Sequence, residues 1–192
     1  GGKMPKQKIT REMVIEAAFD IARREGMEKV IVKNIADKLG CSVQPIYSYC
    51  SNMEGLKAAL TERTGTFMKE YLAAHIEKKD YFRSIGRAQL RFAREEPQLF
   101  QLYFLRRRSD IHSLQDLYSK ESSREVAKFI SDTLQLTMAQ AEQLHLHMII
   151  YTMGIASILA TSCSHIPEEE LMTQLETACD AFLAEIRRKN NE

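Results

Sequence analysis

The sequence predicts an all-α protein. Hydrophobic residues occupy 44% of the 192 positions and charged residues 28%, a balance typical of a folded chain and not of a disordered one. Only eight Gly and four Pro interrupt the sequence, and no segment alternates apolar and polar residues over the length of a strand. These observations favour helices throughout.

The first helix is expected to follow a basic arm at residues 3–11. Thr10 is an N-cap candidate, because its hydroxyl can accept a bond from a backbone N–H that has no partner within the helix. Gly26 provides the stop, and Arg23 and Arg24 lie where the helix dipole favours positive charge. Apolar residues recur at helical spacing between these ends, at Val14, Ala17, Ala18, Ile21 and Ala22.

Two short helices joined by a tight turn are predicted next. The first spans about residues 32–39 and ends at Gly40, and Ser42 can cap the second, whose inward residues are Ile46 and Tyr49. This arrangement is the geometry of a helix-turn-helix, whose second helix can enter the major groove of DNA. An ordinary helical corner has the same spacing, so that alternative stays open at this point.

The outward positions of the second short helix carry groups suited to DNA. Gln44 can bond both hydrogen-bonding groups of an adenine edge, and Val43 or Pro45 can contact a thymine methyl group. Ser48 and Tyr47 complete this mixed polar and apolar surface.

The charge distribution agrees with such a role. Residues 1–63 carry a net charge of +3, and the remainder carries −2. A basic N-terminal segment followed by a near-neutral remainder is typical of a protein that binds nucleic acid through its N-terminal part. A difference of a few charges is common, however, and is weak evidence by itself.

Helices are expected over the rest of the chain as well. Asn52 can cap the first of them, Pro97 breaks the series, and Pro167 occupies the first position of the last. They are predicted at residues 53–74, 81–95, 99–103, 113–134, 139–162 and 167–189.

The segment of residues 144–163 approaches the length of a membrane span. It is interrupted by His145, His147 and several hydroxyl residues, and basic anchors flank neither end. A helix buried by its own domain and by a partner subunit explains it better, so no membrane contact is expected.

The cysteines show no CxxC spacing and lie within apolar helical patterns. We expect them to be reduced, buried residues of a cytoplasmic protein, with neither a disulfide nor a metal role. They are Cys41, Cys50, Cys163 and Cys179.

Three ordered segments resemble the tetracycline-repressor-like (TetR) family of regulators. VIEAAFDIARREG (residues 14–26) looks like the family's first helix, and VKNIADKLGCSVQPIYSYCSNMEGL (residues 32–56) looks like its helix-turn-helix running into the fourth helix. YFRSIGRAQLRFAREEPQLFQLYF (residues 81–104) is similar to a region found in part of the family. The rest of the C-terminal half carries only a helical pattern.

The resemblance implies a fold of about nine helices in two domains. Residues 9–52 would form a helix-turn-helix DNA-binding domain, and residues 53–190 a helical ligand-binding and dimerisation domain. It further implies a cytoplasmic homodimer, held by its last two helices, that represses transcription at a palindromic double-stranded DNA operator until a small molecule releases it. The protein would reach the bacterial nucleoid when bound to DNA, and no cofactor, metal or catalytic residue is implied.

The resemblance also assigns roles to individual residues. Val43, Gln44 and Pro45 would face bases, while Tyr47 and Tyr49 would contact the phosphate backbone. Lys33 and Lys57 would bind phosphate. The full expected DNA-binding set is Lys33, Ser42, Val43, Gln44, Pro45, Tyr47, Ser48, Tyr49 and Lys57.

Three positions depart from the family pattern. Ile31 replaces the capping Thr or Ser before the second helix, Cys50 replaces an aromatic residue, and Met53 replaces a Lys at the start of the fourth helix. Each lost phosphate contact weakens salt-dependent affinity without abolishing specificity. Lys57, one turn on, is a candidate substitute.

Two further surfaces are predicted in the C-terminal half. An apolar or aromatic effector is expected in an interior lined by Phe92, Phe100, Tyr103, Met148, Tyr151 and Thr152. A packed core without a cavity remains open as the alternative, since Met and aromatic residues at helical spacing are usually structural. The dimer surface is expected at Leu144, Met148, Tyr151, Ile155, Ile158, Leu159, Leu175, Cys179, Phe182 and Ile186.

Two other functions remain open from the sequence. One is a helical adaptor that has lost DNA binding, suggested by Ile31 and Met53. The other is a metal-dependent enzyme, because Glu142 and His145 stand three apart as in half of a carboxylate-bridged site. No second such pair exists in the sequence to complete that site.

Overall fold

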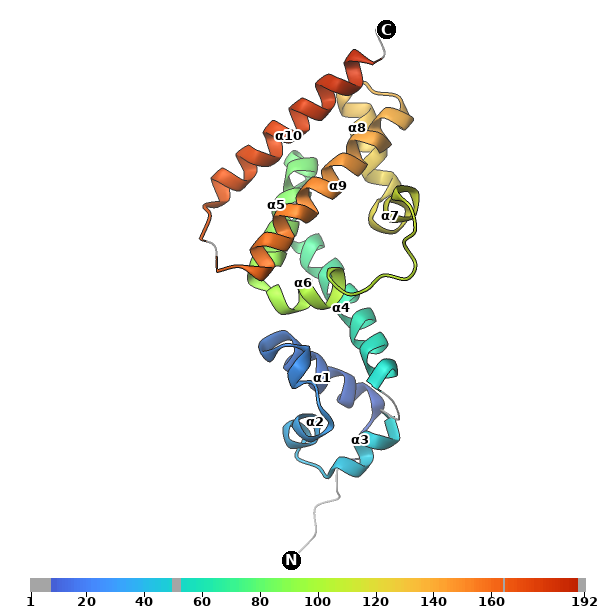
Figure 1. Ribbon diagram of the computed structural model, residues 1–192, viewed down its shortest axis with the longest axis vertical. Coiled ribbons are helices and arrows are strands. Elements are labelled where there is room, and N and C mark those ends of the chain that lie inside the picture. Colours follow the sequence, from blue (N-terminus) through green and yellow to red (C-terminus); the bar gives the residue numbers. More distant parts are fainter. Residues whose placement is uncertain (1–7, 50–52, 164, 190–192) are drawn as a thin grey trace, which may run out of the picture. The chain divides into compact units, whose positions relative to one another are not determined.

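The computed structural model describes residues 8–49, 53–163 and 165–189 and contains only helices there (Figure 1). Ten of them are α-helices and two are short 3-10 helices, so the predicted all-α class is confirmed. The chain divides into two compact units. The head unit comprises Gly1–Glu70 and Gln98–Phe104, and the bundle unit comprises Tyr71–Pro97 and Leu105–Glu192. This division differs from the expected one at residues 52 and 53, because most of the long fourth helix belongs with the head.

The head unit begins with three helices whose ends are set by local signals. The Thr10 hydroxyl caps the first helix by accepting a bond from the Met13 N–H at 3.2 Å, and Gly26 ends it with a φ of 93°. Gly40 ends the second helix in the left-handed region, at φ 64° and ψ 34°, a conformation that favours glycine. These helices are α1 (Arg11–Glu25), α2 (Val32–Leu39) and α3 (Val43–Tyr49), with the 3-10 helix η1 (Met27–Lys29) between the first two.

A small apolar core holds these three helices together. α3 contributes Ile46, which is fully buried, and α2 contributes Ile35 and Ala36. The remaining members come from α1 and from the segment before α2, and they are Val14, Ala17, Ala18, Ile21, Ala22 and Val30. α3 buries only this one side chain fully, and five of its seven residues are exposed.

The long helix α4 (Met53–His75) is fixed to α1 by stacked aromatic and guanidinium groups. The Arg63 guanidinium lies over the Phe19 ring at 4.4 Å, and Arg23 lies over Phe67 at 4.7 Å. The two rings are 5.6 Å apart, and Arg63 also bonds Glu16 at 2.5 Å. These contacts hold α1 against the first part of α4 within the head unit.

The short helix α6 (Pro97–Phe104) packs on α4 at a glycine. A Cβ added at Gly65 would come within 2.9 Å of the Tyr103 ring, so any larger residue would displace that ring. The neighbouring Thr64 is fully buried, and its hydroxyl has no hydrogen-bond partner among the described residues. The contact between α4 and α6 is therefore close.

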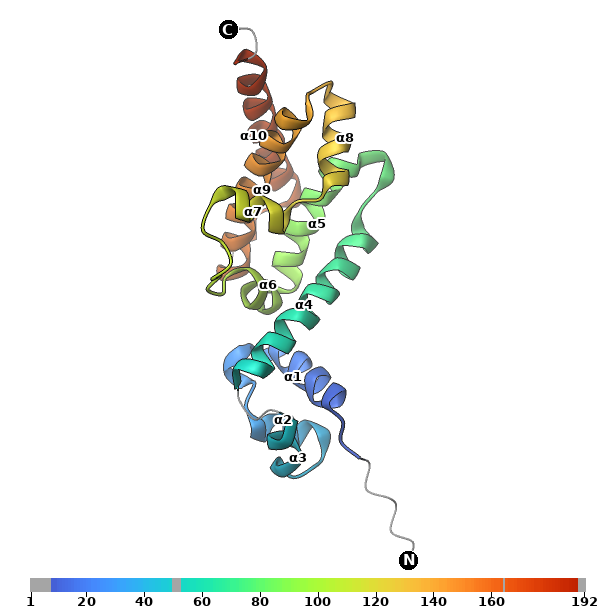
Figure 2. The ribbon, with the colours of Figure 1, turned by 90° about the vertical axis from the view of Figure 1, so that its right-hand side faces the viewer.

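The bundle unit is built around α9 (Met138–Thr161), which packs against α5 (Tyr81–Glu95), α8 (Arg124–Leu134) and α10 (Glu168–Arg188) (Figure 2). α9 starts with a capping box in which the Thr137 hydroxyl accepts from the Gln140 N–H and the Gln140 side chain accepts from the Thr137 N–H. Two further elements, η2 (Lys78–Asp80) and α7 (Leu114–Glu121), complete the unit.

Several predictions for this half require correction. The single polar helix expected over residues 113–134 is two helices, α7 and α8, because extended backbone at Ser122 and Ser123 interrupts it. Pro167 precedes the first turn of α10 and does not lie within it. The cysteines are not buried as expected: Cys41 and Cys179 are half-buried and Cys163 is exposed, while Cys50 lies outside the described residues.

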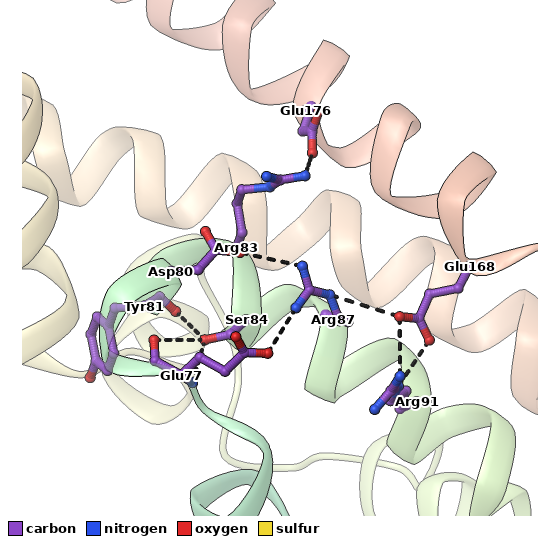
Figure 3. Close-up of polar contacts among 9 residues, drawn as sticks. All are labelled: Glu77, Asp80, Tyr81, Arg83, Ser84, Arg87, Arg91, Glu168 and Glu176. Carbon is purple, nitrogen blue, oxygen red and sulfur yellow. Dashed lines mark hydrogen bonds and ion pairs between the residues drawn. The ribbon is translucent and has the colours of Figure 1, made fainter.

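A row of arginines on α5 ties the bundle together at its edge (Figure 3). Arg83 reaches Glu176 on α10, and Arg91 bonds Glu168 at the start of α10 at 2.8 Å. Arg87 lies between them and bonds Glu77 at 3.1 Å. These side chains stand one helical turn apart, so a single face of α5 holds both η2 and α10.

By length and composition α9 is long and apolar enough to cross a membrane, although it packs within the bundle. Its outward face carries an apolar stripe of Ile150, Gly154 and Ile158, spaced four residues apart. Ile158 is 58% exposed, and a Cβ added at Gly154 would meet no atom within 4 Å. Among the described residues, none covers this stripe.

Candidate nucleic-acid interface

The turn between α2 and α3 is closed by backbone bonds that leave its side chains free. The Gly40 N–H donates to the Asp37 carbonyl at 3.2 Å, and the Cys41 N–H donates to the Ala36 carbonyl at 3.0 Å. This is a glycine-dependent helix end, and it turns the chain directly into α3. The expected helix-turn-helix geometry is therefore present in the head unit (Figure 1).

α3 presents one face away from the head core. Val43, Gln44 and Ser48 are exposed on it, Tyr47 is 59% exposed and Pro45 is half-buried. The Ser48 hydroxyl donates to the Pro45 carbonyl at 2.7 Å, so its oxygen can still accept a bond from outside.

Tyr49 differs from the prediction that it points inward. Its ring is 39% exposed, and its hydroxyl donates to the carbonyl oxygen of Ile9 at 3.0 Å. The end of α3 is therefore linked to the residues before α1. A phosphate oxygen would have to replace Ile9 as the acceptor of this hydroxyl proton.

The remaining expected DNA-binding residues lie near the starts of helices of the head unit. Lys33 is exposed in the first turn of α2, and Ser42 is exposed directly before α3. Lys57 is exposed in α4, where it pairs with Glu54 at 3.3 Å. The structure thus places all nine expected DNA-binding residues in the head unit, exposed or half-buried.

Ile31 does not cap α2. No side-chain hydrogen bond caps the α2 N-terminus, where Ile31 has extended backbone and lies on the surface. The Asn34 side-chain amide donates to the Lys29 carbonyl at 2.8 Å, which links α2 to η1 but provides no acceptor for the free N–H groups at the start of α2. Met53 is also exposed.

The bundle unit contains a cavity of about 340 Å³ between α5, α9 and α10. Apolar side chains form most of its lining, among them Phe82, Ile149 and Leu175. Of the expected ligand-binding residues, Met148 and Thr152 line it. The other four do not: Phe92 is fully buried, Tyr151 packs on Phe182, and Phe100 and Tyr103 belong to the head unit.

Apart from Met148 and Thr152, the sequence did not assign the residues that line this cavity to a ligand site. Gly86 and Cys179 are among them, on α5 and α10, and a Cβ added at Gly86 would come within 3.0 Å of Leu175. A Gly within a helix costs stability, so its presence there indicates a packing or functional requirement. Gly86, in the middle of a predicted helix, was therefore a recognisable candidate in the sequence.

His145 lies between this cavity and α7. It lines the cavity, while its Nδ1 is 3.4 Å from the Tyr118 hydroxyl. Burial lowers the pKa of His145 to about 4, so the ring is neutral at physiological pH. Within the described part of the chain, no group of three His, Cys, Asp or Glu side chains could hold a metal ion, and Glu142, the expected partner of His145, is exposed.

The structure resembles solved regulators of transcription. A TetR-like transcriptional regulator from Rhodococcus sp. RHA1 matches with a TM-score of 0.62 and 20% identity, covering 95% of this chain and 99% of that one. The match shows that the chain has the fold of TetR-like regulators.

Sequence comparison gives a weaker likeness. The uncharacterized HTH-type transcriptional regulator YobS of Bacillus subtilis (strain 168) is 24% identical over 105 residues. The aligned region spans 53% of this chain and 55% of that relative. No family model matches the sequence.

Proposed function

We propose that this protein is a DNA-binding transcriptional regulator. The observation that carries the proposal is the helix-turn-helix, whose second helix presents Val43, Gln44 and Tyr47 to solvent on a fold shared with a TetR-like regulator. A helix that buries one residue and exposes a mixed polar and apolar face adds little to a core. It is well suited to the major groove.

Base and phosphate contacts are divided between elements of the head. Gln44 pairs with an adenine edge, and Val43 and Pro45 contact thymine methyl groups. Lys33 on α2 and Lys57 on α4 neutralise phosphates, which gives salt-dependent affinity that is independent of sequence. Tyr47 contributes a hydroxyl that forms no hydrogen bond with the described residues.

The regulator acts as a homodimer that reads a palindromic operator. The uncovered stripe of Ile150, Gly154 and Ile158 supports association through α9, since a second copy would remove these groups from water. Half of the residues expected at this interface are instead buried within the protomer, namely Leu144, Met148, Leu159, Leu175 and Ile186. Two-fold symmetry would place the two α3 helices about 34–36 Å apart, one turn of DNA.

A small molecule bound in the bundle cavity releases the protein from DNA, which makes it a repressor. The support is the 340 Å³ cavity, which lies within the range of ligand sites. The effector acts by favouring a geometry in which the two heads no longer match the groove spacing. Coupling is reciprocal, so operator DNA weakens the effector by the same factor. Such a protein works in the cytoplasm, where its DNA is.

The test is selection of bound duplexes from a random library by the full chain, followed by affinity measurements on the enriched sequence. Gln44→Ala is expected to lower affinity for the enriched sequence by about 5- to 150-fold and to leave binding to random DNA almost unchanged. Asn34→Ala is the matched control, because Asn34 holds η1 and α2 and is not expected to reach a base. An enriched pool with no two-fold symmetry would contradict the dimeric reading.

A helical adaptor without DNA binding is the second candidate. It is favoured by the uncapped start of α2 at Ile31 and by Met53, since both remove phosphate contacts expected from the family pattern. Failure of the selection to enrich any sequence at low salt would support the adaptor over the regulator.

A further inference from the structure

We propose that the bundle cavity selects a hydrophobic amine, with its apolar body between α5, α9 and α10 and its protonated nitrogen at the mouth beside Asp180. This inference rests on the proposed regulatory function only for its consequence on DNA. The binding site itself stands on the residues of the bundle unit.

The interior of the cavity excludes a charged group. Phe82, Ile149 and Leu175 give it apolar walls, and His145 stays neutral because burial lowers its pKa to about 4. The pKa of the Cys179 thiol is raised by burial and by the nearby Asp180 carboxylate, so it too is uncharged. An ion placed among these groups would lose its hydration without compensation.

Two polar side chains that line the cavity, Gln89 and Thr152, form no hydrogen bond with a described residue. Thr152 is only 4% exposed and lines the cavity, and its hydroxyl forms no hydrogen bond with any described residue. A hydroxyl that opens onto the cavity can bond a ligand that lies there and orient it. The effector therefore carries a hydrogen-bonding group on its buried part.

Charge at the mouth is negative. Of the charged residues that line the cavity, Arg83 and Asp180 are exposed and Glu176 is half-buried, and Arg83 is bound by Glu176 across the α5–α10 edge (Figure 3). Among the described residues Asp180 forms no ion pair, and the nearby Arg83 is paired with Glu176. Because Arg83 neutralises Glu176, the Asp180 carboxylate keeps its negative charge and favours a cation beside it.

The neighbouring arginines do not form an anion site. Arg87 and Arg91 line a separate polar recess, but Glu77, Asp80 and Glu168 already bond their guanidinium groups (Figure 3). An anionic head group would have to displace these carboxylates while lying near Glu176 and Asp180. The arrangement favours a positive head group over a negative one.

The experiment compares probes that share one apolar body. 4-Phenylbutylamine, 4-phenylbutanol and 4-phenylbutyrate are titrated into the full chain by calorimetry and ligand-observed NMR. We expect the amine to bind about two- to five-fold more tightly than the alcohol, the size of an exposed ion pair, and the carboxylate to bind most weakly. Equal binding of amine and alcohol, or tighter binding of the carboxylate, would overturn the proposal.

Two variants locate the contacts. Asp180→Asn should abolish the preference for the amine and leave the alcohol unaffected, whereas Asp132→Asn, the same change at an exposed carboxylate on α8, should alter neither. Thr152→Val should lower affinity for 4-(4-hydroxyphenyl)butylamine but not for the parent amine. An Asp180→Asn variant that keeps the preference would place the cation elsewhere and contradict the assignment.

A final measurement separates this proposal from the regulatory one. Amine binding that depends on Asp180 but does not change affinity for a selected operator supports the site and contradicts release by this effector. Operator binding without any preference for the amine leaves the regulator intact and overturns the ligand class.

Discussion

The Tyr49 hydroxyl donates a hydrogen bond to the carbonyl oxygen of Ile9, 40 positions earlier in the sequence, at 3.0 Å. This bond joins the last residue of α3 to the segment that precedes α1. The hydroxyl proton serves the head's own structure, so the two tyrosines of α3 are not equivalent. Tyr47 has no such partner among the described residues and is more exposed.

Replacing each tyrosine with phenylalanine should separate these roles. Tyr49→Phe should lower the free energy of unfolding by about 0.5–1 kcal/mol, because the Ile9 carbonyl loses its donor. Tyr47→Phe should leave stability unchanged and weaken DNA binding, because its hydroxyl faces solvent. Thermal unfolding and mobility shift of both variants provide the check. A loss of stability in Tyr47→Phe alone would contradict the distinction.

Lys57→Ala should weaken binding to every DNA sequence alike and flatten the dependence of log affinity on log salt by about one unit. Its pair with Glu54 is exposed, so little stability should be lost. Lys128→Ala is the matched control, since Lys128 also forms an exposed intrahelical pair, with Asp132, but in the bundle unit. Binding isotherms between low and physiological salt measure the slope, and equal slopes for the two variants would exclude a phosphate contact by Lys57.

Thr64→Val should stabilise the protein by about 1 kcal/mol. The Thr64 hydroxyl is fully buried without a hydrogen-bond partner in the described part of the chain, and valine has nearly the same shape. The neighbouring Thr66 hydroxyl is exposed and donates to the Glu62 carbonyl, so Thr66→Val should have almost no effect. Denaturant unfolding compares them, and a destabilised Thr64→Val would show that the hydroxyl has a bonding partner in solution.

Ile158→Glu should dissociate the proposed dimer while leaving the protomer folded. The side chain is 58% exposed in the protomer, and only an interface would bury the new charge. Leu114→Glu is a close control, because Leu114 on α7 is 59% exposed. Sedimentation at micromolar concentration should show monomer for the first variant and dimer for the second. A monomeric wild-type protein would contradict the dimer.

Stability should fall on acidification because of His145. Its pKa in the folded protein is lowered from 6.5 to about 4 by burial, so between these values the unfolded chain binds more protons than the folded one. The contribution is present above pH 6.5 and is lost as the pH falls toward 4, amounting to about 3 kcal/mol. His145→Gln should flatten this dependence in unfolding measurements, whereas His147→Gln, at the half-buried histidine two residues on, should not. If the free energy of unfolding of His145→Gln depended on pH as in the wild type, the loss of stability on acidification would come from other groups.

Local chemistry made much of the fold predictable. Thr10 begins α1, Gly26 ends it, and Gly40 ends α2. These signals could be read from the sequence because helix caps act within one turn of the chain. The order of a short helix, a tight turn and another short helix was readable for the same reason. The exposure of Val43, Gln44, Tyr47 and Ser48 on α3 followed from helical spacing around Ile46, whereas that of Tyr49 did not.

Helical spacing alone predicted the apolar positions of α9 but not their partners. Spacing shows that Met148, Tyr151 and Leu159 are apolar positions of α9, but not which neighbouring helix covers each of them. Packing on α5 and α10 buries Leu159, leaves Met148 and Thr152 at a cavity, and turns Ile158 to the surface. Phe92 and Phe100, expected together at a ligand, lie in different compact units.

The sequence by itself determined the all-α class, the helix-turn-helix and most of the residues its second helix exposes, with Tyr49 as the exception. These depend on interactions between residues a few positions apart, whose geometry is nearly independent of the rest of the chain. Only the tertiary structure decided that Tyr49 bonds Ile9, that Arg83 reaches Glu176, and that a cavity lies beside Thr152 and Asp180. Such contacts join segments distant in sequence, and they arise only when packed helices fix where side chains meet.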